Sequence, residues 1–183
     1  MVHQDTQFIS TLVRSGRLRG RTIDKMSSFS SLIHQLTGAI VSNDAAQACA
    51  CFTKTGAYHD VFYGSFEGAA IKTLVNERFH RDGQNFRWDI HDPVDDGSIG
   101  YARYVFSYDS MLEAFKGQRV VFEGVAICQL DNGLISQYRE VADAAPGLLQ
   151  LGFNDERLAK FVRREATALL ARPESAAHLQ RPV

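Results

Sequence analysis

Four runs that alternate between apolar and polar residues follow one another in the second half of the chain. They read FRWDIHDPV, SIGYARYVFSYD, QRVVFEGVAICQL and LISQYREVAD, separated by DDG, by a polar stretch that contains Gly117, and by DNG. Alternation with a period of two is typical of strands that bury one face, and DNG is a strong hairpin signal. The pattern therefore predicts an antiparallel meander whose apolar face needs a covering layer.

Helical periodicity precedes these strands. From Ser27 onward, apolar residues recur at helical spacing, at Phe29, Leu32, Ile33, Leu36 and Ile40. Asn43 or Asp44 is placed to cap a second helix that runs to about Phe52. A short strand lies within GAYHDVFYGSFEG, and AAIKTLVNERFH shows the apolar spacing of a third helix. This order predicts an α+β fold, with three helices packed on one face of a curved antiparallel sheet.

Both ends of the chain differ from this central domain, which is predicted to span 27–153. Residues 1–26 lack a sustained amphipathic pattern and are basic, with Arg14, Arg17, Arg19, Arg21 and Lys25. They are interpreted as a flexible leader, with a basic arm that recruits nucleic acid as the alternative. A C-terminal helix is expected over 154–172, because Asn154 or Asp155 precedes an apolar face and Pro173 ends it. Residues 173–183 are interpreted as a tail.

Charge and cysteine content argue against several classes of function. The chain carries 20 Lys and Arg against 21 Asp and Glu, so it has no global attraction to nucleic acid or to anionic lipid. Cys49, Cys51 and Cys128 are too few for a disulfide framework and favour reduced thiols in a cytoplasmic protein. Cys49 and Cys51 point to different sides of the predicted second helix, so no metal site is expected. No run of about 18 apolar residues is present to span a bilayer.

Two motifs, together with this order of elements, resemble a known family. YHDVFYGSFEG follows the second helix, and LDNGLISQYREVAD closes the sheet. They resemble the conical NTF2-like folds, typified by nuclear transport factor 2, and within them the SnoaL-like and limonene-epoxide-hydrolase-like branches, over residues 28–145. The resemblance implies an apolar pocket inside the cone, no cofactor, and a homodimer formed through the open sheet face. It implies no single activity, because this scaffold hosts isomerases, dehydratases, cyclases, epoxide hydrolases and binding proteins.

The residues of the epoxide-hydrolase branch carry over in part. Tyr58 and Asp60 occupy the positions of a Tyr and an Asn that help to hold the attacking water. The last strand matches a motif that contains an acid, at Tyr138, Arg139, Glu140 and Asp143. Glu140 stands at the acid. Arg103 is the counterpart of a middle Arg, but Val105 stands where that branch has a second carboxylate, which argues against epoxide hydrolysis itself.

A related member, ketosteroid isomerase, places its general-base Asp in a stretch that GAYHDVFYG resembles, with Asp60 at the base. The two oxyanion donors of that enzyme fall at Leu36 and near Ala126, where this chain offers no such donor. Without these donors a dienolate would not be stabilised, so that isomerisation is not expected.

Strand alternation places the candidate residues around a common cavity. Side chains two apart share a face, so Tyr138 pairs with Glu140, and Tyr58 pairs with Asp60. On the preceding strand, three small side chains share one face and are expected to leave an apolar void: Gly124, Ala126 and Cys128. Phe122 and Leu130 would close the ends of this void. The predicted ligand contacts are Phe122, Ala126, Cys128 and Trp88.

Two carboxyl groups in such a cavity suit acid–base chemistry. Burial raises the pKa of a carboxyl group and a nearby Arg lowers it, and both effects are expected at Glu140. The leading hypothesis is a cofactor-independent hydrolase, dehydratase or isomerase that acts on a small, mostly apolar, oxygenated molecule. Glu140 would be the general base and Asp60 the acid or water holder. Arg103 would orient the carboxylate, and Tyr58 and Tyr138 would donate hydrogen bonds.

Structural roles account for the same residues. Glu140 and Arg103 can form a buried ion pair, and Asp60 can cap the turn before Gly64. The tyrosines are typical of a core, and an aromatic stripe fits a core or a dimer face better than a ligand wall, at Trp88, Tyr101, Tyr104, Phe106 and Tyr108. The rival hypothesis is therefore a non-catalytic binding or assembly module, in which polar residues pair with one another and no open cavity reaches Glu140.

Overall fold

The computed structural model describes residues 28–180, so the basic leader and its alternative role lie outside the described residues. One mixed sheet contains β1 (Phe52–Asp60), β2 (Gly64–Glu67), β3 (Gly83–Asp95), β4 (Ile99–Ser110), β5 (Arg119–Asp131) and β6 (Leu134–Asp143). The spatial order is β2-β1-β6-β5-β4-β3, so the predicted antiparallel meander is confirmed as β3 to β6. β1 pairs with β6 in parallel, which the meander pattern did not predict.

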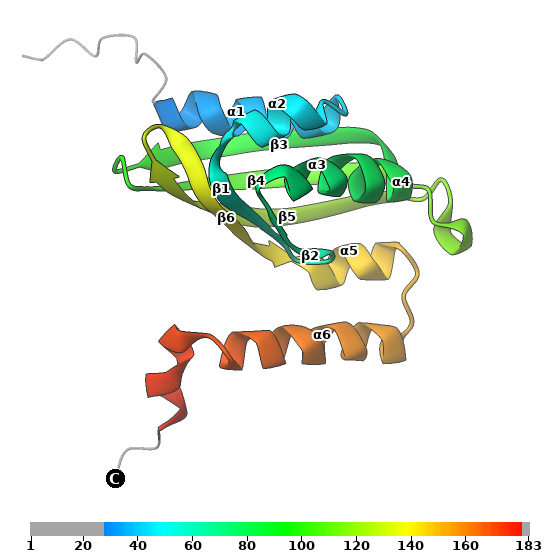
Figure 1. Cartoon of the computed structure of the whole chain (residues 1–183). Helices are drawn as coiled ribbons and strands as arrows, with labels where there is room; N and C mark the ends of the chain where they lie inside the picture. The colour runs from blue at the N-terminus through cyan, green and yellow to red at the C-terminus, as the bar shows by residue number, and fades with distance from the viewer. Residues whose placement is uncertain (1–27, 181–183) are drawn as a thin grey trace, which may run out of the picture.

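Two helices cover one face of this curved sheet (Figure 1). α1 (Ser28–Val41) packs against β3 and against α2 (Ala45–Ala50). The buried face of α1 contains all the residues that helical spacing predicted, namely Phe29, Leu32, Ile33, Leu36 and Ile40. Asp44 caps α2, because its side chain accepts a hydrogen bond of 2.9 Å from the backbone N–H of Gln47.

The predicted third helix is built from several short helical segments. These are a 3₁₀ turn (Gly68–Ala70), α3 (Ile71–Leu74), a π-helical turn (Val75–Phe79) and α4 (His80–Asp82). Their buried side chains are Ile71, Leu74, Val75 and Phe79. The segment lies over the concave side of the sheet (Figure 1), and it ends at Asp82, which lines the cavity described below.

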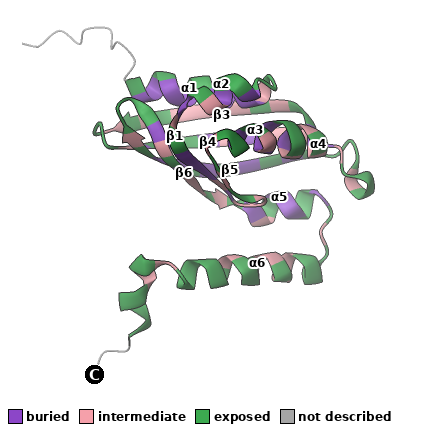
Figure 2. Cartoon of the chain, viewed as in Figure 1, coloured by how far each residue is buried: buried purple, intermediate pink, exposed green. Residues whose placement is uncertain are grey.

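Two helices follow the sheet. α5 (Ala144–Gln150) was not predicted and packs on β5, where Gly147 contacts the ring of Phe122. α6 (Asp155–Leu170) lies in the segment expected to be helical, and Asn154 caps it by accepting from the N–H of Arg157 at 3.0 Å. α6 has no buried residue (Figure 2), and a 3₁₀ segment (Pro173–Leu179) follows it. No helix within residues 28–180 is long and apolar enough to cross a membrane.

All three cysteines are free thiols. Burial raises the pKa of Cys51 to about 11 and that of Cys128 to about 12, so neither thiol is a ready nucleophile near neutral pH. Among the described residues, no three His, Cys, Asp or Glu side chains are grouped to hold a metal ion. The cytoplasmic location that the cysteine content suggests stays a prediction.

Candidate active site

Two tyrosines hold Glu140 on the inner face of the sheet. Its Oε2 accepts hydrogen bonds from the hydroxyl of Tyr104 at 2.8 Å and from the hydroxyl of Tyr138 at 3.1 Å. Tyr138 lies two residues earlier on β6, so strand alternation puts both side chains on one face. Tyr104 belongs to β4 and reaches across β5, which separates the two strands.

The missing side chain at Gly124 makes this reach possible. Tyr104 stands opposite Gly124 in the register of β4 with β5, and Ala126 stands opposite Glu140 in the register of β5 with β6. A Cβ atom at Gly124 would lie 2.5 Å from Tyr104 Oη. The prediction of a void along this strand is therefore wrong, because the side chain of Tyr104 fills the space beside Gly124. Ala126 and Cys128 are buried but do not line the cavity, so their predicted ligand contacts are not supported.

Asp60, the last residue of β1, combines a structural role with a place in the cavity wall. It is 8% exposed, and its Oδ1 accepts hydrogen bonds of 2.8 Å from the backbone N–H groups of Phe62 and Tyr63. The carboxylate thus caps the turn that leads to Gly64, as the structural reading expected. The same side chain also lines the cavity.

The pKa values of both carboxyl groups are raised towards neutrality. Burial raises the pKa of Glu140 to about 7, the charge of Asp60 adds to the rise, and the hydroxyls of Tyr104 and Tyr138 oppose it. Burial also raises the pKa of Asp60 to about 6, against the two backbone N–H groups that stabilise its charged form. Such values suit groups that exchange protons near neutral pH.

Tyr58 adds a hydroxyl group without a partner to this cluster. It stands opposite Tyr138 in the parallel register of β1 with β6, and the two rings stack with centroids 4.2 Å apart. Tyr58 is 1% exposed, and its hydroxyl lies close to that of Tyr138 without a well-formed hydrogen bond to any described residue. Burial raises the pKa of Tyr58 well above its ordinary value, so the hydroxyl stays protonated. A buried donor left unpaired costs about 1–3 kcal/mol, which a ligand oxygen could recover.

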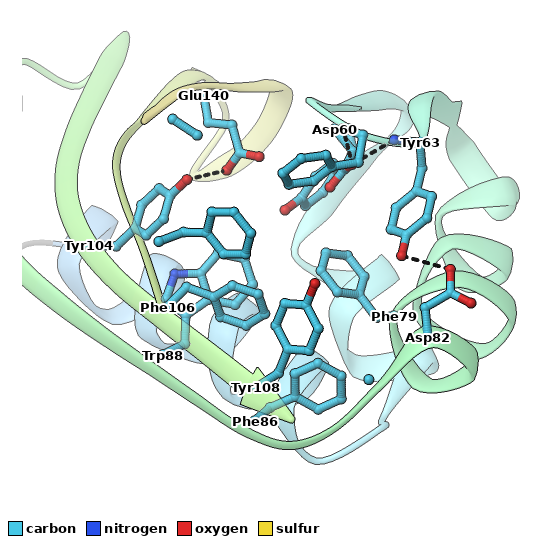
Figure 3. Close-up of a pocket in the computed structure, with 15 residues that line it drawn as sticks. Asp60, Tyr63, Phe79, Asp82, Phe86, Trp88, Tyr104, Phe106, Tyr108 and Glu140 are labelled. Carbon is cyan, nitrogen blue, oxygen red and sulfur yellow. Dashed lines mark hydrogen bonds between the residues drawn. The ribbon is translucent and has the colours of Figure 1, made fainter. Parts of the chain in front are cut away.

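These groups line one end of an aromatic cavity of about 40 Å³ (Figure 3). Its apolar wall is formed by Phe62, Phe79, Phe86, Trp88, Phe106 and Phe122. Two of the predicted ligand contacts, Trp88 and Phe122, therefore lie in the wall. The aromatic stripe of the middle strands, expected to be core or dimer face, also contributes to the cavity wall. Its residues there are Tyr104, Phe106 and Tyr108. The space holds about three water molecules, so a larger ligand must displace aromatic rings.

Helix α6 lies outside the acid end of the cavity. Arg164 Nη2 donates a hydrogen bond of 2.6 Å to the carbonyl of Val61, and the ring of Phe161 lies 5.7 Å from that of Phe62. A groove of about 900 Å³ is lined by α6 together with residues of β1 and β6, and it includes Asp60 and Glu140. The two acids therefore line both the aromatic cavity and this outer groove.

Arg103 does not contact Glu140, which corrects both the orienting role and the buried ion pair expected from the sequence. Its side chain is 44% exposed and lies 3.2 Å from Glu123 and 3.6 Å from Asp92. The next residue, Tyr104, takes the position beside the acid. Strand alternation explains why Tyr104, and not Arg103, lies beside Glu140, because neighbouring residues on β4 point to opposite faces of the sheet.

The sequence of this chain matches one known protein family. The model of the SnoaL-like domain matches residues 33–138, which is more than half of the 183 residues. The chain belongs to the SnoaL-like domain family. This SnoaL-like match includes Tyr58, Asp60 and Tyr104, and it ends at Tyr138, two residues before Glu140. No curated protein matches the chain.

Solved structures of SnoaL-like and related proteins share the fold at low identity. An LEH-like epoxide hydrolase from M. tuberculosis is 18% identical, covers 77% of this chain and 99% of its own, and has a TM-score of 0.57. A protein with a ketosteroid isomerase-like fold from Catenulispora acidiphila is 13% identical over 68% of this chain and 95% of its own, with a TM-score of 0.61. An NTF2-like protein from Burkholderia thailandensis is 14% identical, covers 68% of this chain and 96% of its own, and has a TM-score of 0.54. The predicted NTF2-like α+β cone is thus confirmed, and such likeness carries no activity with it.

Proposed function

We propose that this protein is an acid–base enzyme that acts, without a cofactor, on a small and mostly apolar oxygenated molecule. The observation that carries the proposal is the pair of carboxyl groups, buried Asp60 and half-buried Glu140, at one end of an aromatic cavity. Burial raises the pKa values of Glu140 and Asp60 to about 7 and about 6. Hydrolysis, dehydration and isomerisation all need such a pair, which can remove one proton and deliver another.

The hydrogen bonds around the two acids suggest how the pair shares a proton. Two backbone N–H groups stabilise the ionised form of Asp60, and burial raises the pKa of Glu140 to the higher value, about 7. Near neutral pH the pair can hold one proton, so one carboxyl group can act as the base while the other acts as the acid. Because the two groups interact, their proton losses belong to the pair rather than to either residue alone.

Three tyrosines complete the proposed machinery. Tyr104 and Tyr138 fix the position of Glu140 through its Oε2. The unpartnered hydroxyl of Tyr58 would donate to the substrate oxygen on which negative charge develops. Arg103 has no place in this proposal, because it is paired on the outer face of the sheet.

The first test combines ligand screening with substitution of the acids. Terpene epoxides, sterols, phenolic polyketides and fatty acids are screened by thermal shift, and compounds that raise the Tm are assayed for turnover. Glu140→Gln and Asp60→Asn should each remove turnover while the fold survives. Glu123→Gln is the matched control, because that glutamate lies on the outer face and pairs with Arg103. A Glu140→Gln variant as active as the wild type would rule out the proposed chemistry.

A non-catalytic ligand-binding module is the second candidate. It is favoured by the small size of the cavity, about 40 Å³, and by the pairing of Glu140 with two tyrosines inside the fold. It predicts a thermal shift without turnover, and an equal shift in the wild type and in Tyr58→Phe. An acid–base enzyme instead requires turnover that depends on Glu140.

We further propose that two copies of this chain pair through the outer face of the sheet. That face exposes large apolar side chains, with Tyr101 42%, Val121 43%, Val125 36% and Val141 57% exposed. Covering them removes apolar surface from water. Sedimentation of the wild type as a dimer and of Val125→Lys as a monomer is the expected result. A monomeric wild type at micromolar concentration would contradict it.

A further inference from the structure

Polar groups also lie at the end of the cavity remote from Glu140. The hydroxyl of Tyr63 donates a hydrogen bond of 2.9 Å to Asp82 Oδ2 (Figure 3). Tyr108 lines the cavity with them. Tyr104 and Tyr108 share a face of β4 and are four residues apart, a span of about 13 Å along the strand. The cavity therefore has one polar end at Glu140 and another at Asp82, with aromatic rings between them (Figure 3).

Asp82 is fixed at this second end as a charged acceptor. Arg81 donates to both carboxylate oxygens, each at 2.6 Å. Burial acts to raise the pKa of Asp82, but the hydrogen bonds from Arg81 and Tyr63 outweigh it and lower the pKa. A carboxylate has about four acceptor positions, and Arg81 and Tyr63 fill all but one of them. One further donor can therefore bind to Asp82.

Tyr108 supplies a complementary hydroxyl. Its side chain points into the cavity (Figure 3), and its hydroxyl makes no hydrogen bond to another residue within 28–180. Burial raises the pKa of Tyr108 to about 12, so the group stays protonated and can both donate and accept. A bound hydroxyl group can donate a hydrogen bond to Asp82 or to Tyr63 Oη and accept one from Tyr108. It would then use a free acceptor position at Asp82 or Tyr63 and the free donor of Tyr108.

We propose that Tyr63, Asp82 and Tyr108 bind a hydroxyl group at the end of a ring-containing ligand remote from Glu140. The inference rests on the proposed function, because it describes the far end of the same substrate. Phe79 and Phe86 line the cavity beside this contact and suit a flat ring. The substrate class is thus a flat molecule that carries an oxygen function at each end, one facing Glu140 and one facing Asp82.

A pair of simple aromatic probes tests this assignment. One is a naphthalenediol with hydroxyl groups at opposite ends, and the other is the naphthol that lacks one of them. Dissociation constants are measured by isothermal titration calorimetry. Quenching of the fluorescence of Trp88, the one tryptophan of the chain, places the probe in the cavity. The wild type should bind the diol about three- to tenfold more tightly than the naphthol, as one additional hydrogen bond predicts.

Tyr108→Phe removes the hydroxyl that would donate to the ligand beside Asp82, and it leaves the two acids in place. In this variant the affinity for the diol should fall to that for the naphthol. Tyr101→Phe, which alters a tyrosine 42% exposed on the outer face, should keep the preference for the diol. Loss of turnover in Glu140→Gln tests the proposed function independently of this preference.

Three results would overturn the inference. The first is equal binding of diol and naphthol by the wild type. The second is an unchanged preference in Tyr108→Phe, which would mean that only water occupies the second contact. The third is binding of neither probe. In the first two cases the acid–base proposal stands or falls on its own turnover test, so the failures are distinguishable.

Discussion

The hydroxyl of Tyr104 lies 2.8 Å from Glu140 Oε2 although the two residues are 36 positions apart and a strand separates them. The contact exists because Gly124, the residue between them, has no side chain. Residues of β4, β5 and β6 thus determine the environment of the Glu140 carboxyl group. The pKa of Glu140 depends on a residue of another strand, and each partner can be altered separately.

Tyr104→Phe should raise the pKa of Glu140 above about 7, because it removes a hydrogen bond that stabilises the ionised form. If the enzyme needs one proton on the acid pair, the alkaline limb of its pH–rate profile should move to higher pH. A hydrogen bond to a charged group is worth about 1.5–3 kcal/mol, so the shift should be readily measurable. Tyr101→Phe is the control, and an unmoved alkaline limb in Tyr104→Phe would contradict the role given to this contact.

Gly124→Ala should destabilise the fold and disturb the site together. The new Cβ would lie 2.5 Å from Tyr104 Oη and 2.9 Å from the carbonyl oxygen of Val141, so the ring or the strand must move. Overpacking of this kind costs about 1–3 kcal/mol. The same substitution at Gly38, an exposed helical position with no atom within 4 Å of its Cβ, should instead stabilise the protein by about 0.5–1 kcal/mol. Urea unfolding of both variants measures the contrast, and equal effects would refute it.

Strand periodicity was sufficient to predict where several site residues point. The pairing of Tyr138 with Glu140 followed from alternation alone, and the structure has both on the inner face. The same rule, applied to β4, points to Tyr104, because Ala102, Tyr104 and Phe106 are among its buried residues. Its correspondence to a family motif points to Arg103 instead.

Other features depend on contacts that local patterns do not record. The parallel pairing that stacks Tyr58 on Tyr138 joins strands far apart in the chain, and the residues of neither strand specify the partner. α5 was missed because Pro146 and Gly147 are poor helix formers, yet Gly147 is where the helix packs closely on Phe122. The contact of Tyr63 with Asp82 likewise requires the three-dimensional path of the loop after β1.

The free energy of unfolding should fall as the pH rises from about 4 to about 7 through the acid pair. The pKa values of Glu140 and Asp60 are raised from 4.5 and 3.8 to about 7 and about 6. Between the ordinary and the raised values, the folded protein holds protons that the unfolded chain has released. The stabilisation is therefore complete at low pH and lost as the pH passes the raised values.

Glu140→Gln isolates this contribution. Glutamine does not titrate, and removal of the Glu140 charge also lets Asp60 ionise more easily. The fall in stability over the same pH range should therefore be smaller in Glu140→Gln than in the wild type, whereas Glu123→Gln should follow the wild type. Urea denaturation at intervals between about pH 4 and pH 8 provides the comparison. Parallel curves for wild type and Glu140→Gln would show that the environment of Glu140 is not as described.

Arg164→Gln should raise the pKa of Asp60 and move the acid limb of the pH–rate profile to higher pH. The positive charge of Arg164, on α6, favours the ionised form of Asp60 and is one of the influences that oppose burial. Because the Arg164 side chain is 52% exposed, solvent and salt screen its charge, and the shift should be less than about one pH unit. Arg163→Gln, one position earlier on the same helix and also exposed, removes the same charge and should leave the limb in place. The difference between the two variants should shrink in high salt if it is electrostatic. Equal profiles at low salt would mean that α6 does not tune the acid pair.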